Sequence, residues 1–149
     1  MKRIFEISLA QWSLHKALFA GYIQSIDFPQ ISKEQFDIHA VEYVNSFFPD
    51  RQPTPEFVGE LKTRCDDVEV TSLLIMCDGE GNLGDPDNAK RTKAIENHYK
   101  WIDAAVVLGC HSIRVNAQSS GTPDEQKKLA ADGLRRLAEH GDTKKINVI

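Results

Sequence analysis

Polar side chains that could bind a ligand follow four predicted strands of this chain, each near the point where a strand ends. The carboxyl ends of parallel strands meet at one edge of a sheet, and ligands bind there in α/β folds. Gathered at one edge, such groups predict a polar pocket for a hydroxyl-rich small molecule, although each alone is more often a loop or helix cap. Asn45 also closes one of these strands. The candidate substrate-binding residues are Gln11, His15, Glu42, Asp78, Glu80 and Asn116.

A literal G-x-G-x-x-G motif is formed by Gly79, Gly81 and Gly84. Between a strand and a helix, this motif is typical of dinucleotide binding. Here the helix start signals, Asp85 and Pro86, come after the third glycine, and the acidic side chains around the loop would repel a pyrophosphate. We therefore expect no nucleotide at this loop. The structural interpretation is a flexible loop whose glycines permit positive φ.

The 5 histidines and 3 cysteines show no metal-ligand spacing. No C-x-x-C pair occurs, so Cys65, Cys77 and Cys110 are expected to be buried, reduced thiols of a cytoplasmic protein. No metal ligand is predicted in this chain. His98 falls on the apolar face of a predicted helix and is interpreted as a hydrogen-bonded, partly buried residue.

Two other side chains each allow two interpretations of their role. Trp12, beside the predicted pocket, either stacks on a sugar face or packs in the core. Arg114 stands inside a predicted strand, so its charge needs a partner if it points inward, and Glu42 is the candidate.

Composition excludes several classes of protein. The chain has 149 residues, of which 41% are hydrophobic and 27% charged, as in an ordinary globular domain. A net charge of −4 argues against a nucleic-acid binder, which would be strongly basic. No apolar run is long enough for a membrane span, and the start of the chain lacks the apolar stretch of a secretory signal. One domain over residues 1–149 is expected.

Short apolar runs alternate with stretches of helical period. The predicted strands are Ile4–Leu9, Ala40–Val44, Val70–Cys77, Ser112–Asn116 and Ile146–Ile149. The predicted helices are Ser32–Phe36, Pro55–Val68, Asp85–Leu108 and Thr122–Glu139, with Gly109 and Gly141 as stops. Strands joined by crossover helices are parallel. The pattern fits either a doubly wound open sheet or part of a (β/α)8 barrel.

The last four residues form an apolar strand without a cap or a polar tail. An open sheet that ends on such an edge invites pairing with another chain. We expect either a fragment boundary here or a half-barrel that completes itself by self-association through its open face.

A family resemblance is carried by five segments: ISLAQWSL, AVEYVNSFF, SLLIMCDGEGNLGD, ENHYKWIDAAVVLGCHSIRVN and INVI. They resemble the N-terminal half of the xylose-isomerase-like TIM barrels, and more narrowly the sugar phosphate isomerases/epimerases. The resemblance favours the (β/α)8 barrel, of which this chain would hold about the first four and a half βα units.

The resemblance also implies a reaction. A divalent metal (Mn, Mg or Zn) would polarise a sugar carbonyl, and carboxylates would move the proton through an enediol-like intermediate. The family's metal ligands lie at the ends of the fifth to eighth strands, so none is assigned here. We expect this chain to form one wall of the site for a sugar or sugar phosphate, and to be inactive and free of catalytic metal by itself. The alternative is a non-catalytic, self-associating half-barrel or binding fragment.

Overall fold

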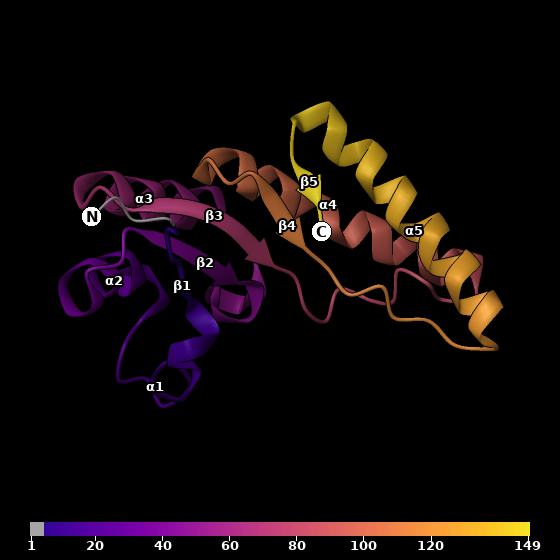
Figure 1. Ribbon diagram of the computed structural model, residues 1–149, viewed down its shortest axis with the longest axis horizontal. Helices are drawn as coiled ribbons and strands as arrows, with labels where there is room; N and C mark the ends of the chain where they lie inside the picture. The colour runs from indigo at the N-terminus through magenta and orange to yellow at the C-terminus, as the bar shows by residue number, and fades with distance from the viewer. Residues whose placement is uncertain (1–4) are drawn as a thin grey trace.

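A parallel sheet forms the centre of the computed structural model, which describes residues 5–149 (Figure 1). Its strands are β1 (Leu9–Ala10), β2 (Ala40–Val44), β3 (Thr71–Met76), β4 (Ser112–Arg114) and β5 (Asn147–Val148). They lie in the order β1-β2-β3-β4-β5, and every neighbouring pair is parallel. The prediction of a parallel α/β fold is confirmed, and strand order equal to chain order is what a TIM barrel requires.

Within residues 5–149, five α-helices accompany the sheet. They are α1 (His15–Phe19), α2 (Phe28–Phe36), α3 (Pro55–Asp67), α4 (Asn88–Leu108) and α5 (Pro123–Lys144). No helix crosses β2, β3 and β4 on the side that faces the viewer in Figure 1. The sheet is therefore a partial barrel with helices on its outside and an open inner face. No helix in residues 5–149 combines the length and apolar character that crossing a bilayer needs.

Register separates the two faces of the sheet. Tyr43, Ile75 and Ile113 lie side by side on neighbouring strands and are fully buried. Tyr43 contacts Phe28 of α2, with ring centroids 6.1 Å apart, so this row faces the helices. Because side chains alternate along a strand, the next row faces the other way.

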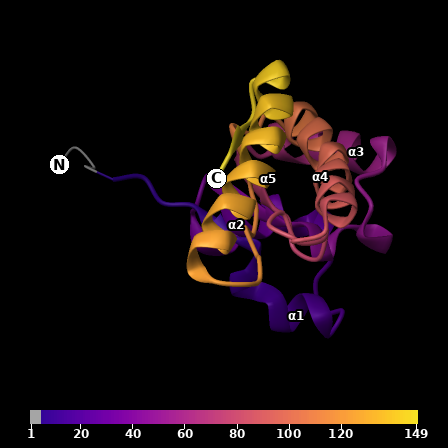
Figure 2. The ribbon, with the colours of Figure 1, turned by 90° about the vertical axis from the view of Figure 1, so that its right-hand side faces the viewer.

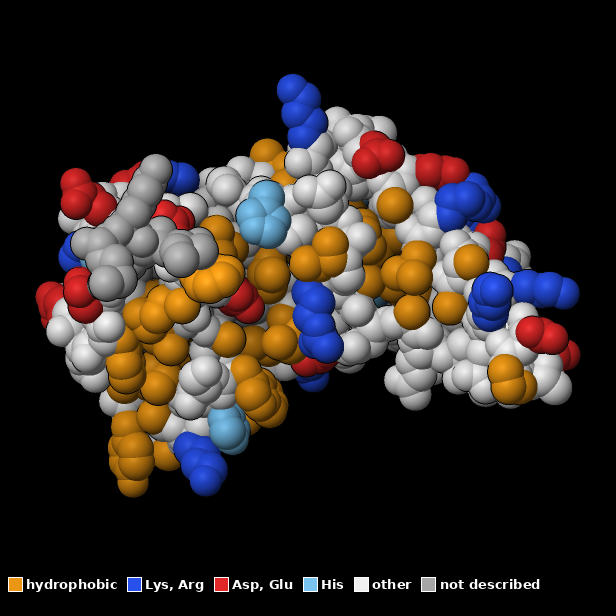
Figure 3. Space-filling view, in the orientation of Figure 1, with side chains coloured by type: hydrophobic (Ala, Val, Ile, Leu, Met, Phe, Trp, Pro, Cys, Tyr) orange, Lys and Arg blue, Asp and Glu red, His pale blue; other side chains and the backbone are white. Residues whose placement is uncertain are grey.

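Two members of this second set, Val44 and Ser112, are buried. We call the other members the open-face residues: Glu42, Leu74, Met76 and Arg114. These side chains are half-buried or exposed. In Figure 3, which looks onto this side, hydrophobic side chains mix with charged ones along the sheet.

The ends of the long helices differ from the predicted ones. Helix α4 is capped by Asp87, whose carboxylate accepts from the backbone N–H groups of Ala89 and Lys90 at 2.8 and 3.2 Å. The predicted start at Asp85 is wrong, because that carboxylate instead accepts from the N–H of Asp87 at 2.9 Å and forms a turn before the helix. Gly109 ends α4 at φ 76°, as predicted.

Helix α5 begins at the predicted Thr122–Pro123 pair but runs past Gly141 to Lys144. An added Cβ at Gly141 would lie 2.5 Å from the carbonyl oxygen of Ile146. This glycine therefore allows the returning chain to pack against the helix, and Lys145 in a left-handed conformation makes the turn instead.

The N-terminal prediction needs the largest correction. Ile4 of the predicted strand lies outside the described residues, and strand pairing starts only at Leu9. Phe5 is 81% exposed, and the segment that leads to β1 runs away from the body of the molecule in Figure 2. Only Leu9 and Ala10 reach partners on β2. Helix α1 has no predicted counterpart, and α2 begins four residues before Ser32.

Candidate functional site

The side chains of Asp78 and Asn116 meet at the carboxyl ends of the neighbouring strands β3 and β4. The amide Nδ2 of Asn116 donates to Oδ1 of Asp78 at 2.6 Å. Asp78 is half-buried and Asn116 is exposed. No described residue donates to Oδ2 of Asp78, and Oδ1 of Asn116 makes no hydrogen bond within residues 5–149. The pair thus presents two acceptor oxygens at the edge where a ligand of an α/β fold would bind.

Asn45 supports this pair from the end of β2. Its side chain is completely buried, with Nδ2 2.8 Å from the carbonyl oxygen of Asp78 and Oδ1 3.0 Å from the N–H of Asp78. Both backbone groups of Asp78 are therefore fixed by one amide. Asn45 is not among the six predicted residues; its sequence signal is a polar residue placed directly after an apolar strand.

Glu80 faces the helix layer. Its Oε1 accepts from the indole N–H of Trp101 at 2.8 Å and from Nδ2 of Asn45 at 3.1 Å, and its Oε2 lies 3.5 Å from Nζ of Lys100. The side chain is only 11% exposed. These contacts fasten the loop after β3 to α4, so Glu80 positions Asp78 while its own carboxylate is already engaged. We call Asn45, Asp78, Glu80 and Asn116 the strand-end cluster.

His98 lies on α4, three residues before the Trp101 that donates to Glu80. It is buried, and its Nδ1 is 2.7 Å from the carbonyl oxygen of Ala94. Burial lowers the pKa of His98 and outweighs the opposite effect of the Glu80 charge. The interpretation of His98 as a buried, hydrogen-bonded residue is confirmed.

The glycines of the loop allow close packing. Gly79 and Gly81 have φ of 77° and 100°, as predicted, whereas the third glycine of the motif, Gly84, has no positive φ. An added Cβ at Gly79 would lie 2.9 Å from Nη2 of Arg51, and at Gly81 it would lie 2.9 Å from Cβ of Ala94. The loop therefore lies directly against α4 and against the loop after β2.

Gln11 is placed in the interior. It is fully buried, its Nε2 donates to Oγ of Ser25 at 2.8 Å, and its Oε1 accepts from the N–H of Val44 at 3.0 Å. Both ends of the amide are used by the protein. In this structure Gln11 joins the loop after β1 to the end of β2, which is a structural role.

His15 belongs to a group of rings at the ends of β1 and β2. It stacks on Trp12, with centroids 4.9 Å apart and planes inclined by 8°, and its Nδ1 is 2.7 Å from the carbonyl oxygen of Trp12. Phe19 and Phe47 lie 6.2 and 6.0 Å from the Trp12 ring. We call Trp12, His15, Phe19 and Phe47 the aromatic cluster. Trp12 is 45% exposed, so it is not a core residue.

Glu42 lies on the open face, where its Oε1 accepts from Oγ of Ser8 at 2.5 Å. The predicted pairing with Arg114 is wrong. Strand β3 lies between β2 and β4, and Arg114 forms no ion pair within residues 5–149. The structure thus brings Asp78, Glu80 and Asn116 together. It leaves Gln11 and His15 in the segment after β1 and Glu42 on β2, apart from them.

A metal site needs several donor atoms that converge on one point. Among residues 5–149, no group of three or more His, Cys, Asp or Glu side chains is arranged to hold an ion. The described donor set does not fit the divalent metal that the resemblance implies.

Comparison with known proteins agrees with the fold. The model of the family described as "Xylose isomerase-like TIM barrel" matches residues 33–149. No curated protein sequence matches the chain.

Solved structures with the same fold include three with different activities in their titles. The E. coli 3-keto-D-glucoside 4-epimerase YcjR has a TM-score of 0.67 at 16% identity, over 83% of this chain and 49% of that one. The D-psicose 3-epimerase of Clostridium cellulolyticum H10, solved with D-tagatose, gives 0.71 at 13%, over 97% and 51%. The probable 3-DHS dehydratase AsbF of Bacillus anthracis gives 0.70 at 17%, over 97% and 51%. The chain spans about half the length of these proteins, and at such identities the likeness shows the fold alone.

Proposed function

The chain belongs to the xylose isomerase-like TIM-barrel family, and from that premise we propose that it supplies one wall of the site of a sugar isomerase or epimerase. The observation that carries the proposal is the Asp78–Asn116 pair at the carboxyl ends of adjacent strands. Free acceptor oxygens at this edge suit the hydroxyl groups of a sugar. Two structures with the same fold are titled as epimerases of sugars or sugar derivatives.

The residues of this chain would bind and orient the substrate. Oδ2 of Asp78 and Oδ1 of Asn116 accept hydrogen bonds from two sugar hydroxyls. Asn45 and Glu80 keep Asp78 in place, so little ordering is needed when the sugar binds. Trp12 and His15 offer an apolar wall on the side of β1.

The proposed reaction needs a divalent metal (Mn, Mg or Zn) and carboxylates that transfer a proton. Since residues 5–149 do not form such a site, these groups would come from outside the described part of the chain. We therefore propose that the 149-residue chain binds sugar but does not turn it over. A phosphorylated sugar and a cytoplasmic location belong to the same proposal.

Calorimetric titration of the chain with D-psicose, D-tagatose and D-fructose tests sugar binding. We expect Asp78→Asn to weaken binding at least about tenfold, because a hydrogen bond to a charged group contributes about 1.5–3 kcal/mol. Asn116→Ala should weaken it by roughly two- to tenfold, because a hydrogen bond between neutral groups contributes about 0.5–1.5 kcal/mol. Asp124→Asn, in the first turn of α5, is the matched control and should have no effect. The proposed site would be refuted if the affinity for sugar were unchanged in both variants, or if the wild-type chain bound no sugar.

A second candidate is a self-associating half-barrel without catalysis. The half-buried apolar side chains of Leu74 and Met76 on the open face favour it, because apolar surface is stabilised by a covering partner. Calorimetry and sedimentation velocity on the chain separate the two candidates. Sugar binding that Asp78→Asn weakens would favour the enzyme, whereas self-association without sugar binding would favour the second candidate.

A further inference from the structure

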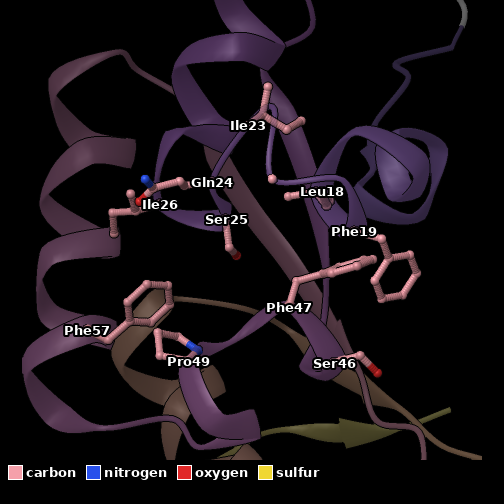
Figure 4. Close-up of a pocket in the computed structure, with 11 residues that line it drawn as sticks. Leu18, Phe19, Ile23, Gln24, Ser25, Ile26, Ser46, Phe47, Pro49 and Phe57 are labelled. Carbon is pink, nitrogen blue, oxygen red and sulfur yellow. The ribbon is translucent and has the colours of Figure 1, made fainter.

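A hollow of about 420 Å³ lies between the loop after α1 and the start of α3 (Figure 4). Most of its wall is apolar, formed by Leu18, Ile23, Ile26, Phe47, Pro49 and Phe57. The polar groups on the wall are two serines and one glutamine, and none of its lining residues is charged. Volume and lining are those of a small-molecule site, which is mostly apolar with a few polar groups.

Two sets of contacts connect the wall of the hollow with the candidate site. Phe19 and Phe47, with ring centroids 5.1 Å apart, line the hollow and also belong to the aromatic cluster (Figure 4). Ser46, also on the wall, accepts from Nη2 of Arg51 at 3.4 Å, and the same nitrogen donates to the carbonyl oxygen of Asp78 at 3.2 Å. One guanidinium therefore links the hollow to the strand-end cluster.

The backbone that holds Arg51 is unusual. Asp50 and Arg51 are consecutive non-glycine residues at φ 50° and 53°. The other non-glycine residues with positive φ in the described part of the chain, Asp37, Glu69 and Lys145, are single and lie just after helices, where such a conformation is common. The tandem pair lies at the ligand-binding edge, where strained conformations often serve function.

We propose that the hollow is a second subsite, which binds an uncharged apolar substituent on the sugar, such as the aglycone of a glycoside. The sugar part of this ligand rests on the proposed function, whereas the hollow is defined by its own volume and lining residues. An uncharged lining gives no group to neutralise a phosphate or carboxylate, and the aromatic walls suit a ring. A substrate that spans both parts would place its hydroxyls at Asp78 and Asn116 and its apolar group between Phe47 and Phe57.

Calorimetry on the 149-residue chain with three probes tests the proposal: methyl β-D-glucopyranoside, phenyl β-D-glucopyranoside and phenol. We expect the phenyl glycoside to bind at least about tenfold more tightly than the methyl glycoside, since burial of a ring removes well over 50 Å² of apolar surface at about 25 cal/mol per Å². Ile23→Trp should fill the hollow and abolish this preference without changing methyl glycoside binding. Phe47→Ala, which removes a wall instead, should also reduce the preference.

The control is Val107→Trp, which adds the same ring to an exposed position on α4 and should leave all three affinities unchanged. Equal binding of the two glycosides overturns the subsite, as does a preference that survives Ile23→Trp. If phenol binds but neither glycoside does, and Ile23→Trp abolishes phenol binding, the hollow is confirmed as a ligand site and the proposed sugar site is refuted. If Ile23→Trp instead dissociates an oligomer in sedimentation, the occupant is a second copy and the subsite is overturned.

Discussion

Replacing Gly133 by alanine should destabilise the protein, although alanine is the better helix former. Gly133 lies in α5 against the loop after β3, and an added Cβ would lie 1.8 Å from the carbonyl oxygen of Leu83 and 2.7 Å from its carbonyl carbon. Both atoms are backbone, so the helix and the loop must move apart. Leu83 is fully buried, which leaves the loop little room to move.

The expected magnitude follows from two opposing effects. Alanine in a helix interior is favoured over glycine by about 1 kcal/mol, whereas overpacking typically costs about 1–3 kcal/mol and sometimes more. A contact this short belongs at the upper end, so we expect a net loss of about 2 kcal/mol. For a chain of this size that loss lowers the Tm by about 4–8 °C.

Gly59 is the matched control because it lies inside α3 and an added Cβ there meets nothing within 4 Å. Gly59→Ala should therefore raise the free energy of unfolding by about 0.5–1 kcal/mol. Thermal and guanidinium unfolding followed by circular dichroism measure both variants. If Gly133→Ala is as stable as the wild type, the loop is not packed against α5 as described, and the support of Asp78 by this loop is wrong as well.

Three further predictions concern a buried histidine, the thiols and the open face. Burial lowers the pKa of His98, so the unfolded chain takes up a proton more readily than the folded one. The free energy of unfolding should therefore be constant above pH 6.5 and fall below it. His98→Gln should flatten this slope in urea titrations from pH 5 to 8. Burial raises the pKa of Cys110 to about 12 and that of Cys77 well above its usual range, and Cys65 is also buried; Ellman's reagent at pH 8 should therefore label the native protein slowly and all 3 thiols after unfolding, and fast native labelling would contradict the packing. Leu74→Glu should shift the chain toward monomer in sedimentation velocity at tens of micromolar, and a monomeric wild type would remove the argument for self-association.

The sequence predicts β2 well, because strands on both sides fix it, whereas the predicted Val70–Cys77 and Ser112–Asn116 extend beyond β3 and β4. Val41 and Tyr43 alternate with half-buried residues between two other strands, and β2 has its predicted bounds. The predicted start of the first strand is wrong because the length of a strand depends on its partner, and β2 pairs only with Leu9 and Ala10. Apolar composition alone cannot show that Phe5 and Ile7 have nothing to pack against.

The orientation of the candidate site residues escapes the sequence for a related reason. Position after a strand places Asp78, Glu80 and Asn116 at the carboxyl ends of β3 and β4, but it cannot tell which side chain points to solvent. Glu80 turns toward α4 because Trp101 and Lys100, about 20 residues further along the chain, offer it a donor and a positive charge. Gln11 turns inward because Ser25 and the backbone of Val44 complete its hydrogen bonds. Such partners become visible only once the helices are docked.

Buried and exposed members of the strand-end cluster depend on each other. A buried amide or carboxylate without a hydrogen-bond partner lowers the free energy of unfolding. The buried conformations of Asn45 and Glu80 are therefore stable only while their partners stay in place. Those partners include both backbone groups of Asp78, and therefore the orientation of the exposed Asp78–Asn116 pair follows from the buried contacts beneath it. A ligand that meets this edge meets a preformed pair of oxygens. The stability of the loop and the affinity for sugar should accordingly change together when Asn45 is altered, whereas a substitution at Asn116 should change affinity alone.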